Sequence, residues 1–282
     1  MRRWRRRRRW LVMGVVIFGS YIAVVIVFQS LQNSLIFPGA MTQGAAEAQV
    51  QPNAGEQLVS LATSTGDRVA ALFGKAAMAG DEPRPTVLFF YGNGMCLAAS
   101  QDLAEWFRAL GFDVLVPEYV GYGMSDGEPS EPGCYATADA AYDWLIARGV
   151  DPQRLIVVGW SLGGAVAIDL AARKPVAGLM VLSAFTSLVE MAKAHYAFLP
   201  VERLLKHRFE SETKISQVHC PTVIGYGDAD TLVPGEMSQR LAKAAGGTVE
   251  LFRVAGASHN DFFSKAQRQV AEHLRALAAR RG

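Results

Sequence analysis

The sequence predicts an α/β fold, in which a mostly parallel sheet carries helices on both faces and follows one transmembrane helix. Two observations support this prediction. Short, continuous apolar runs, typical of strands buried on both faces, alternate with longer amphipathic segments typical of helices. Ahead of them lies an uncharged apolar segment from Trp10 to Phe28. Half of the 282 residues are hydrophobic, which is enough for the core of one large domain.

The apolar segment 10–28 is close to the length of about 20 residues that a helix needs to cross the hydrocarbon core. It is apolar on all faces, unlike the helices of a soluble domain. The apolar region of a cleaved signal peptide is shorter, about 7–15 residues. Cleavage stays open, because Ala46-Glu47-Ala48 has the small-x-small form. The prediction is a single-pass signal anchor at 10–28.

The basic residues are concentrated in a tail at residues 1–9, which holds Arg2, Arg3 and Arg5 through Arg9. The positive-inside rule then places the N-terminus in the cytoplasm. The catalytic body is expected in the periplasm or outside the cell, or in a lumen if the source is eukaryotic. Without those seven arginines, 21 basic residues face 26 acidic ones, a net charge of −5. Nucleic-acid binding is not expected, because it needs a basic folded surface.

The rest of the chain divides into a linker and lead-in at 29–57 and one folded domain at 58–282. Residues 39–57 are rich in Ala, Gly, Gln and Asn, as linkers are. The expected strands are 86–91, 113–117, 155–159, 179–182, 222–225 and 249–254. The expected helices are 97–110, 135–147, 162–173 and 261–279.

A G-x-S-x-G motif runs from Gly159 to Gly163, directly after an apolar strand and at the start of a helix. This is the context of a nucleophile elbow. A sharp strand-to-helix turn leaves no room for side chains beside the serine, so glycines flank it. The helix dipole favours negative charge that develops on the serine oxygen. The motif therefore predicts Ser161 as a nucleophile rather than an incidental serine in a glycine-rich turn.

A nucleophilic serine needs a histidine base and a carboxylate that orients it, in the chain order Ser, Asp or Glu, His. Of the five histidines, only His259 lies between the last strand and the last helix. The acid is expected after strand 222–225, where Asp228 and Asp230 compete. The spacing alone does not show which of the two aspartates is the acid.

Three segments resemble the membrane-anchored esterase and thioesterase branch of the α/β-hydrolase superfamily, which includes protein depalmitoylases. They are residues 33–38, 119–125 and 184–187. The resemblance runs from about Leu35 to the C-terminus. It implies an α/β-hydrolase fold. The family's G-x-x-D-x-x-V-P acid loop matches Gly227, Asp230, Val233 and Pro234, so the resemblance implies Asp230 as the acid.

The oxyanion hole needs two backbone N–H donors. One is expected on Leu162, which follows the nucleophile. The resemblance implies the other in the loop after Tyr91, on Asn93. The family usually has H-G-N-x-G there, whereas this chain has Tyr91 in place of the histidine, and Val120 replaces an arginine common in the family. A backbone donor survives these changes, but the bracing of the loop must differ.

A small cap is expected at about 185–217, over the site. Its apolar residues are expected to include part of an acyl pocket, because small-molecule sites are mostly apolar. They are Phe185, Leu188, Met191, Tyr196, Phe198, Leu199, Leu204 and Leu205.

Together these features predict a serine hydrolase that cleaves a carboxylic ester or thioester through an acyl-enzyme. The expected substrates are acyl compounds, among them lipids and acylated proteins, and the expected membrane contact is the N-terminal helix. No metal or organic cofactor is expected, and the three cysteines lack zinc-site spacing. Two alternatives are a serine peptidase of the same fold and a catalytically silent, membrane-tethered binding domain. The complete order Ser161, Asp230, His259 argues against the silent domain.

Overall fold

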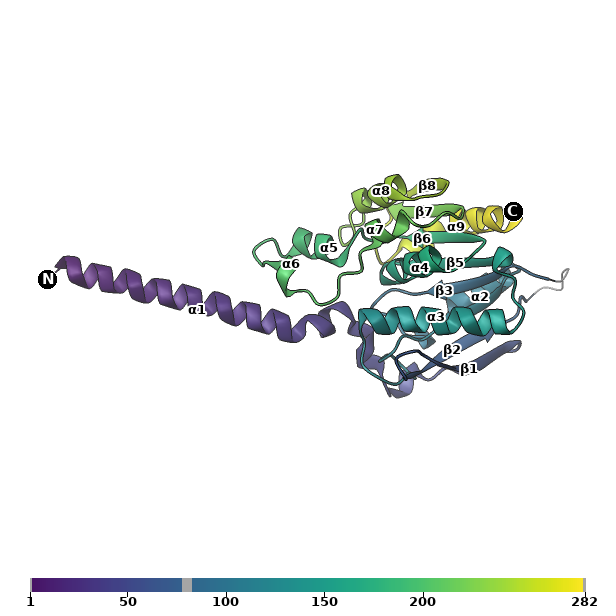
Figure 1. The fold of residues 1–282 in the computed structure, drawn as a ribbon, viewed down its shortest axis with the longest axis horizontal. Coiled ribbons are helices and arrows are strands. Elements are labelled where there is room, and N and C mark those ends of the chain that lie inside the picture. The colour runs from purple at the N-terminus through teal and green to yellow at the C-terminus, as the bar shows by residue number, and fades with distance from the viewer. Residues whose placement is uncertain (1, 78–82, 281–282) are drawn as a thin grey trace.

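The protein is built on one eight-stranded sheet, with the strand order β1-β2-β4-β3-β5-β6-β7-β8 (Figure 1). The computed structural model describes residues 2–77 and 83–280. Met1, residues 78–82, residues 281–282 and the side chains of Arg2, Arg3 and Arg5–Arg8 in the expected basic tail lie outside this description. The strands are β1 (Glu56–Ala62), β2 (Arg68–Gly74), β3 (Thr86–Phe90), β4 (Asp113–Pro117), β5 (Leu155–Trp160), β6 (Gly178–Leu182), β7 (Thr222–Gly227) and β8 (Val249–Val254).

The expected mostly parallel sheet is confirmed. From β4 to β8 every neighbouring pair is parallel. At the other edge β1 and β2 form an antiparallel hairpin, and β2 pairs antiparallel with β4. The prediction lacked β1 and β2. Strand β1 is half-exposed along most of its length and has no continuous apolar run. Strand β2 is mostly buried, and its apolar run at residues 69–73 was missed.

Helices cover both faces of the sheet, as expected (Figure 1). On one face lie α2 (Gln101–Ala109) and α9 (Phe262–Ala279). Their rings Phe107 and Phe263 both contact Phe89 of β3, with ring centroids 5.3 and 6.0 Å away. The other face carries α3 (Glu131–Ala147), α4 (Leu162–Arg173), α7 (Ser211–Ile215) and α8 (Gly235–Ala244).

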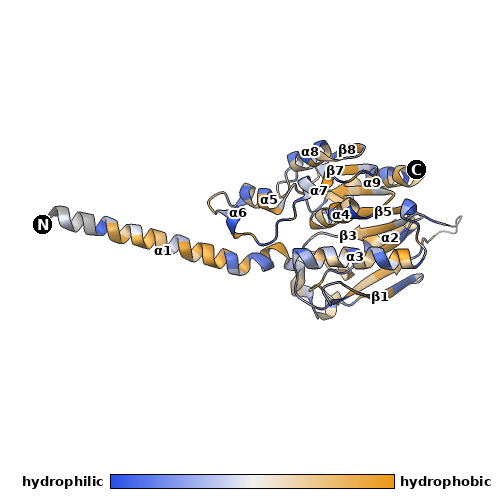
Figure 2. Cartoon of the chain, in the orientation of Figure 1, coloured by the Kyte–Doolittle hydropathy of each residue, from blue (hydrophilic) through white to orange (hydrophobic). Residues whose placement is uncertain are grey.

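The N-terminal helix α1 (Arg2–Ile36) projects away from the sheet (Figure 1). Its segment Arg9–Ile36 is long and apolar enough to cross a membrane, with a mean hydropathy of 2.7. Apolar residues cover most of the projecting part, and a hydrophilic stretch follows near the body (Figure 2).

The expectation of a linker at 29–57 is wrong. Helix α1 continues through Ile36, and two 3-10 turns, Pro38–Thr42 and Ala46–Ala48, follow directly. Phe37 and Ala48 are fully buried in the body. The Ala, Gly, Gln and Asn content of residues 39–57 suggested a linker, but this segment is attached to the domain: the side-chain amide of Gln43 donates to the carbonyls of Ser125 and Gly127 at 2.9 and 3.1 Å.

The cap is smaller than the expected 185–217. It consists of α5 (Leu188–His195) and α6 (Val201–Leu204), and "the cap" below means residues 188–205. Helix α7 belongs to the body, because it packs on α4 and its Lys214 Nζ lies 2.6 Å from Asp169 Oδ1.

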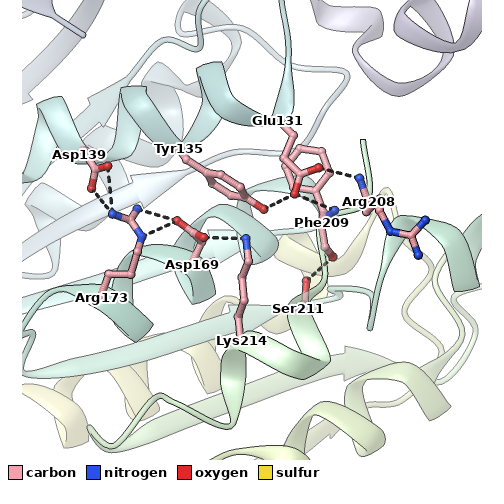
Figure 3. Close-up of polar contacts among 9 residues, drawn as sticks. All are labelled: Glu131, Tyr135, Asp139, Asp169, Arg173, Arg208, Phe209, Ser211 and Lys214. Carbon is pink, nitrogen blue, oxygen red and sulfur yellow. Dashed lines mark hydrogen bonds and ion pairs between the residues drawn. The ribbon is translucent and has the colours of Figure 1, made fainter. Parts of the chain in front are cut away.

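Two carboxylates fasten the segment that returns from the cap to the body (Figure 3). Glu131, at the start of α3, accepts from the backbone N–H groups of Arg208 and Phe209 at 2.6 and 3.0 Å. Asp169 on α4 holds Lys214 and, through its other oxygen, Arg173 at 2.6 Å. The helix that follows Ser161 is thereby tied to the exit of the cap.

Replacing Asp169 with alanine is expected to lower the free energy of unfolding by about 2–3 kcal/mol, because it removes charged hydrogen bonds to a buried carboxylate and leaves Lys214 without that ion pair. Arg173 keeps its pair with Asp139 at 2.9 Å. The side chain of Asp169 is 7% exposed. The midpoint of thermal unfolding of the full chain in detergent measures the effect.

Asp143→Ala is the control, because Asp143 pairs with Lys174 at 3.0 Å but its side chain is 63% exposed. Asp143→Ala should lower the free energy of unfolding by less than about 1 kcal/mol. Equal losses for the two variants would contradict the role of Asp169.

Candidate active site

Ser161 lies in a strained turn between β5 and α4, with φ 55° and ψ −118°. A Cβ on Gly159 would lie 2.2 Å from the carbonyl oxygen of Gly163. A Cβ on Gly163 would lie 2.0 Å from the carbonyl oxygen of Phe90. Both glycines of the motif are therefore required for the backbone to pass so closely. The positive φ is the kind of backbone strain that occurs at functional sites.

His259 connects Ser161 and Asp230. Its Nε2 lies 2.9 Å from Ser161 Oγ, and its Nδ1 lies 2.7 Å from Asp230 Oδ2. The indole of Trp160 stacks beside the imidazole, with centroids 5.9 Å apart and an interplanar angle of 28°. All three polar residues are buried, at 7–9% exposure. With Nδ1–H donating to the carboxylate, Nε2 is left to accept the serine proton.

The sheet brings these residues together, because each follows a strand at its carboxyl end. Ser161 follows β5, Asp230 follows β7 and His259 follows β8. The last two strands are neighbours in parallel register, with Gly227 opposite Val254. Ligands of parallel sheets bind at this edge.

The two competing aspartates occupy different places. Asp230 Oδ1 accepts from the N–H groups of Leu232 and Val233, at 3.0 and 2.8 Å, which leaves Oδ2 for His259. Asp228 Oδ1 instead accepts from the N–H of Gly256 at 2.6 Å. Asp228 thus fastens a neighbouring turn, while Asp230 is the aspartate that reaches the histidine.

The loop after β3 is braced by Glu118. The Tyr91 hydroxyl donates to Glu118 Oε1, and the same oxygen accepts from the N–H of Leu97 at 2.8 Å. The Tyr119 hydroxyl donates to the carbonyl of Tyr91 at 2.9 Å. Tyr91, which replaces the family's histidine, therefore holds the loop by its side chain. Asn93 lines one pocket with Ser161 and Leu162, where both expected oxyanion donors lie.

Burial raises the pKa of the Glu118 carboxyl, and the Tyr91 hydroxyl and the Leu97 N–H lower it in part. We expect Tyr91→Phe to cost about 1.5–3 kcal/mol of stability at pH 8, because an ionised buried carboxylate loses a donor. Without the Tyr91 hydroxyl, the pKa of Glu118 in the folded variant rises further. The folded variant then binds more protons than the unfolded chain over a wider pH range. Its destabilisation should therefore be smaller at pH 5 and grow as the pH rises.

Tyr119→Phe is the matched control for this pH dependence. It removes a hydroxyl that braces the same loop from the segment after β4, but the acceptor of that hydroxyl is the neutral carbonyl of Tyr91. Its cost should be about 1 kcal/mol and the same at both pH values. Unfolding curves at pH 5 and pH 8 give the destabilisation of both variants. The same change of destabilisation with pH in the two variants would contradict the role of Glu118.

An apolar pocket of about 360 Å³ opens at Ser161. Five of the eight expected cap residues line it, namely Phe185, Leu188, Met191, Tyr196 and Leu205. Of the other three, Phe198 is 65% exposed, Leu199 is buried elsewhere in the core, and Leu204 packs against the core partly buried. Residues of α1 that the sequence did not predict for the site also line the pocket: Phe28, Gln32, Leu35 and Ile36.

Comparisons with known proteins agree with this architecture. Residues 85–201 match the family model of the alpha/beta hydrolase fold. The chain is 35% identical to the uncharacterized protein Rv2307c of Mycobacterium tuberculosis over 91% of this chain and 90% of that one. It is 32% identical to alpha/beta hydrolase domain-containing protein 17B of Xenopus tropicalis over 71% of this chain and 67% of that one.

Solved structures share the fold at lower sequence identity. The esterase Pf2001 of Pyrococcus furiosus superposes with a TM-score of 0.66 at 18% identity, over 80% of this chain and 90% of that one. An alpha-beta hydrolase of Vibrio vulnificus superposes with a TM-score of 0.68 at 20% identity, over 86% of this chain and 92% of that one. By its sheet, its serine turn and these relatives, the chain belongs to the α/β-hydrolase superfamily.

Proposed function

We propose that this protein is a serine hydrolase that cleaves a carboxylic ester or thioester through an acyl-enzyme. One observation carries the proposal. The two ring nitrogens of His259 lie 2.9 Å from Ser161 Oγ and 2.7 Å from Asp230 Oδ2, and Ser161 lines an apolar pocket. Such a chain of contacts activates a serine for attack on a carbonyl group.

The proposed reaction has two halves. In the first, His259 Nε2 takes the proton of Ser161 as Oγ attacks the carbonyl carbon, and the backbone N–H groups of Leu162 and Asn93 hold the oxyanion. His259 then gives that proton to the departing alkoxide or thiolate. In the second half a water molecule, deprotonated by His259, attacks the acyl-enzyme. The acid leaves, and Ser161 regains its proton.

An activity-based probe tests the reaction class. A fluorophosphonate should label the wild-type chain at Ser161, and excess ester substrate should slow the labelling. The substrate class follows from a panel that contains p-nitrophenyl esters of several chain lengths, acyl-thioesters and a peptide amide. If only the peptide amide is cleaved, the protein is a serine peptidase and not an esterase. If the probe labels nothing, a catalytically silent binding domain is favoured.

We further propose that α1 anchors the protein in a membrane with its N-terminus in the cytoplasm and its catalytic domain on the other side. The apolar part of α1 has the length of a span (Figure 2). The arginines before it supply the charge bias that sets orientation.

Protease accessibility tests this orientation. Protease added to intact cells or spheroplasts should digest the catalytic domain, because the domain is exposed on the outer side of the membrane. A cytoplasmic protein in the same sample, protected until lysis, is the control. Protection of the domain in intact spheroplasts, with digestion only after lysis, would reverse the orientation.

A further inference from the structure

The pocket at Ser161 has one side that does not belong to the hydrolase domain. Phe28, Gln32, Leu35 and Ile36, here called the α1 face, line it from the membrane helix. Cap residues line the pocket as well. The helix that carries the membrane span is therefore also part of the site.

Hydrogen bonds hold the α1 face against the domain at both edges of the pocket. The side-chain amide of Asn93, whose backbone N–H is one of the two expected oxyanion donors, donates to the carbonyl of Ile36 at 3.0 Å. Gln32 is 2% exposed, and its Oε1 accepts from the N–H of Lys206 at 3.0 Å. Asn33 Oδ1 lies 3.1 Å from Nε2 of His207. The helix is thus fixed in register with the site instead of being tethered loosely.

The pocket runs along α1 away from Ser161. Ile36 is bonded at Asn93, while the ring of Phe28 meets Tyr196 of the cap, with centroids 5.6 Å apart. A rise of 1.5 Å per residue puts Phe28 about 12 Å further along the helix than Ile36. Beyond it the hydroxyl of Tyr21 lies 3.4 Å from the carbonyl oxygen of Phe198.

The far end of the cap lies at the level of the apolar run. Tyr21 is in the middle of the uncharged segment of α1. Its cap neighbour Phe198 is 65% exposed, and Tyr196 is 37% exposed. Large apolar side chains exposed beside a membrane-spanning helix are suited to contact with lipid.

We infer that the α1 face selects the acyl group of the substrate, and that the pocket takes up a long acyl chain directly from the bilayer. The carbonyl lies at Ser161, and the chain runs along α1 between Leu35 and Phe28 toward the membrane. The inference rests on the proposed ester or thioester hydrolysis and adds its chain selectivity. It gives the anchor helix a second role as a specificity-determining element.

Two substitutions on α1 should shift chain selectivity in opposite directions. Leu35→Trp fills the pocket near Ser161, so the ratio of kcat/KM for p-nitrophenyl palmitate to that for the acetate should fall roughly tenfold. Phe28→Ala removes the ring that lines the pocket at its far end beside Tyr196, so the preferred chain should become longer. The full-length protein is assayed in phosphatidylcholine vesicles with acetate, octanoate and palmitate esters.

Val27→Trp is the matched control on the same helix. Val27 is 54% exposed, and its side chain is turned by about 100° from Phe28. This variant should keep the wild-type chain-length profile. If Leu35→Trp and Phe28→Ala also keep it, while fluorophosphonate still labels Ser161, the inference is overturned and the proposed function stands. A wild-type chain that hydrolyses no ester or thioester overturns both.

A second arm separates the sources of the acyl chain. Vesicles carry either 1-palmitoylglycerol or a peptide with an S-palmitoyl cysteine, and the release of palmitate is measured. Leu35→Trp should slow whichever substrate the wild-type chain cleaves, because both present the same chain to the α1 face. An unchanged rate for the cleaved substrate would contradict the inference.

Discussion

Ser161→Ala is expected to lower kcat by roughly 10⁴–10⁶, as loss of the nucleophile does in serine-hydrolase triads. Only Oγ is removed, and it is the atom that His259 Nε2 contacts at 2.9 Å. The backbone turn, fixed by Gly159 and Gly163, does not depend on the hydroxyl. Folding should therefore be retained. Hydrolysis of the best ester or thioester of the panel and fluorophosphonate labelling give two independent measurements.

Ser258→Ala provides the control for this substitution. Ser258 neighbours His259 in the same loop, and its backbone N–H, which donates to Asp261 at 2.7 Å, remains in the variant. Activity should stay close to that of the wild type. A Ser161→Ala protein that is folded and fully active would refute the acyl-enzyme mechanism.

Asp230→Asn is expected to lower kcat by about 10⁴, because an amide neither fixes the required histidine tautomer nor stabilises the imidazolium. The carboxylate oxygen that faces His259 Nδ1 at 2.7 Å would become a neutral group. The other oxygen can still accept from Leu232 and Val233, so the loop should keep its shape. Steady-state kinetics on the same substrate measure the loss.

The neighbouring Asp228→Asn supplies the comparison. Its amide oxygen can replace the acceptor for the Gly256 N–H, and Asp228 does not touch His259 in the structure. We expect a loss of less than about tenfold, the size of a modest disturbance in an adjacent turn. The opposite order of effects would move the acid to Asp228.

The central strands could be predicted from the sequence because burial on both faces imposes a continuous apolar run. Strands 113–117 and 249–254 and helix 162–173 have the predicted bounds. The edge strand β1 carried no such run. Strand β2 has one at residues 69–73, but two of its five residues are alanines, which are depleted in strands. The first turn of α3 was missed, because Glu131-Pro132-Gly133 looks like a break. Proline is tolerated at a helix start, where Ser130 Oγ accepts from the Gly133 N–H.

The site was predictable where it depends on local sequence. The glycines around Ser161 and the loop position of His259 follow from the chain itself. Spacing did not separate Asp228 from Asp230, because two residues of one turn differ only in which backbone groups they meet. The attachment of α1 to the domain joins residues far apart in the chain, such as Asn33 and His207. Neither local composition nor periodicity records such a contact.

The attachment of α1 sets an order of assembly during biogenesis. The helix is synthesised before the partners that fix it, and Lys206 follows Gln32 by 174 residues. In the proposed topology, the candidate site is therefore completed late, when the segment after the cap has crossed the membrane and met a helix already inserted there. Ala48 is fully buried once this has happened. A leader peptidase that cut the chain after Ala48 would therefore have to act before the domain has folded. The released domain would lack α1 and with it one side of the pocket.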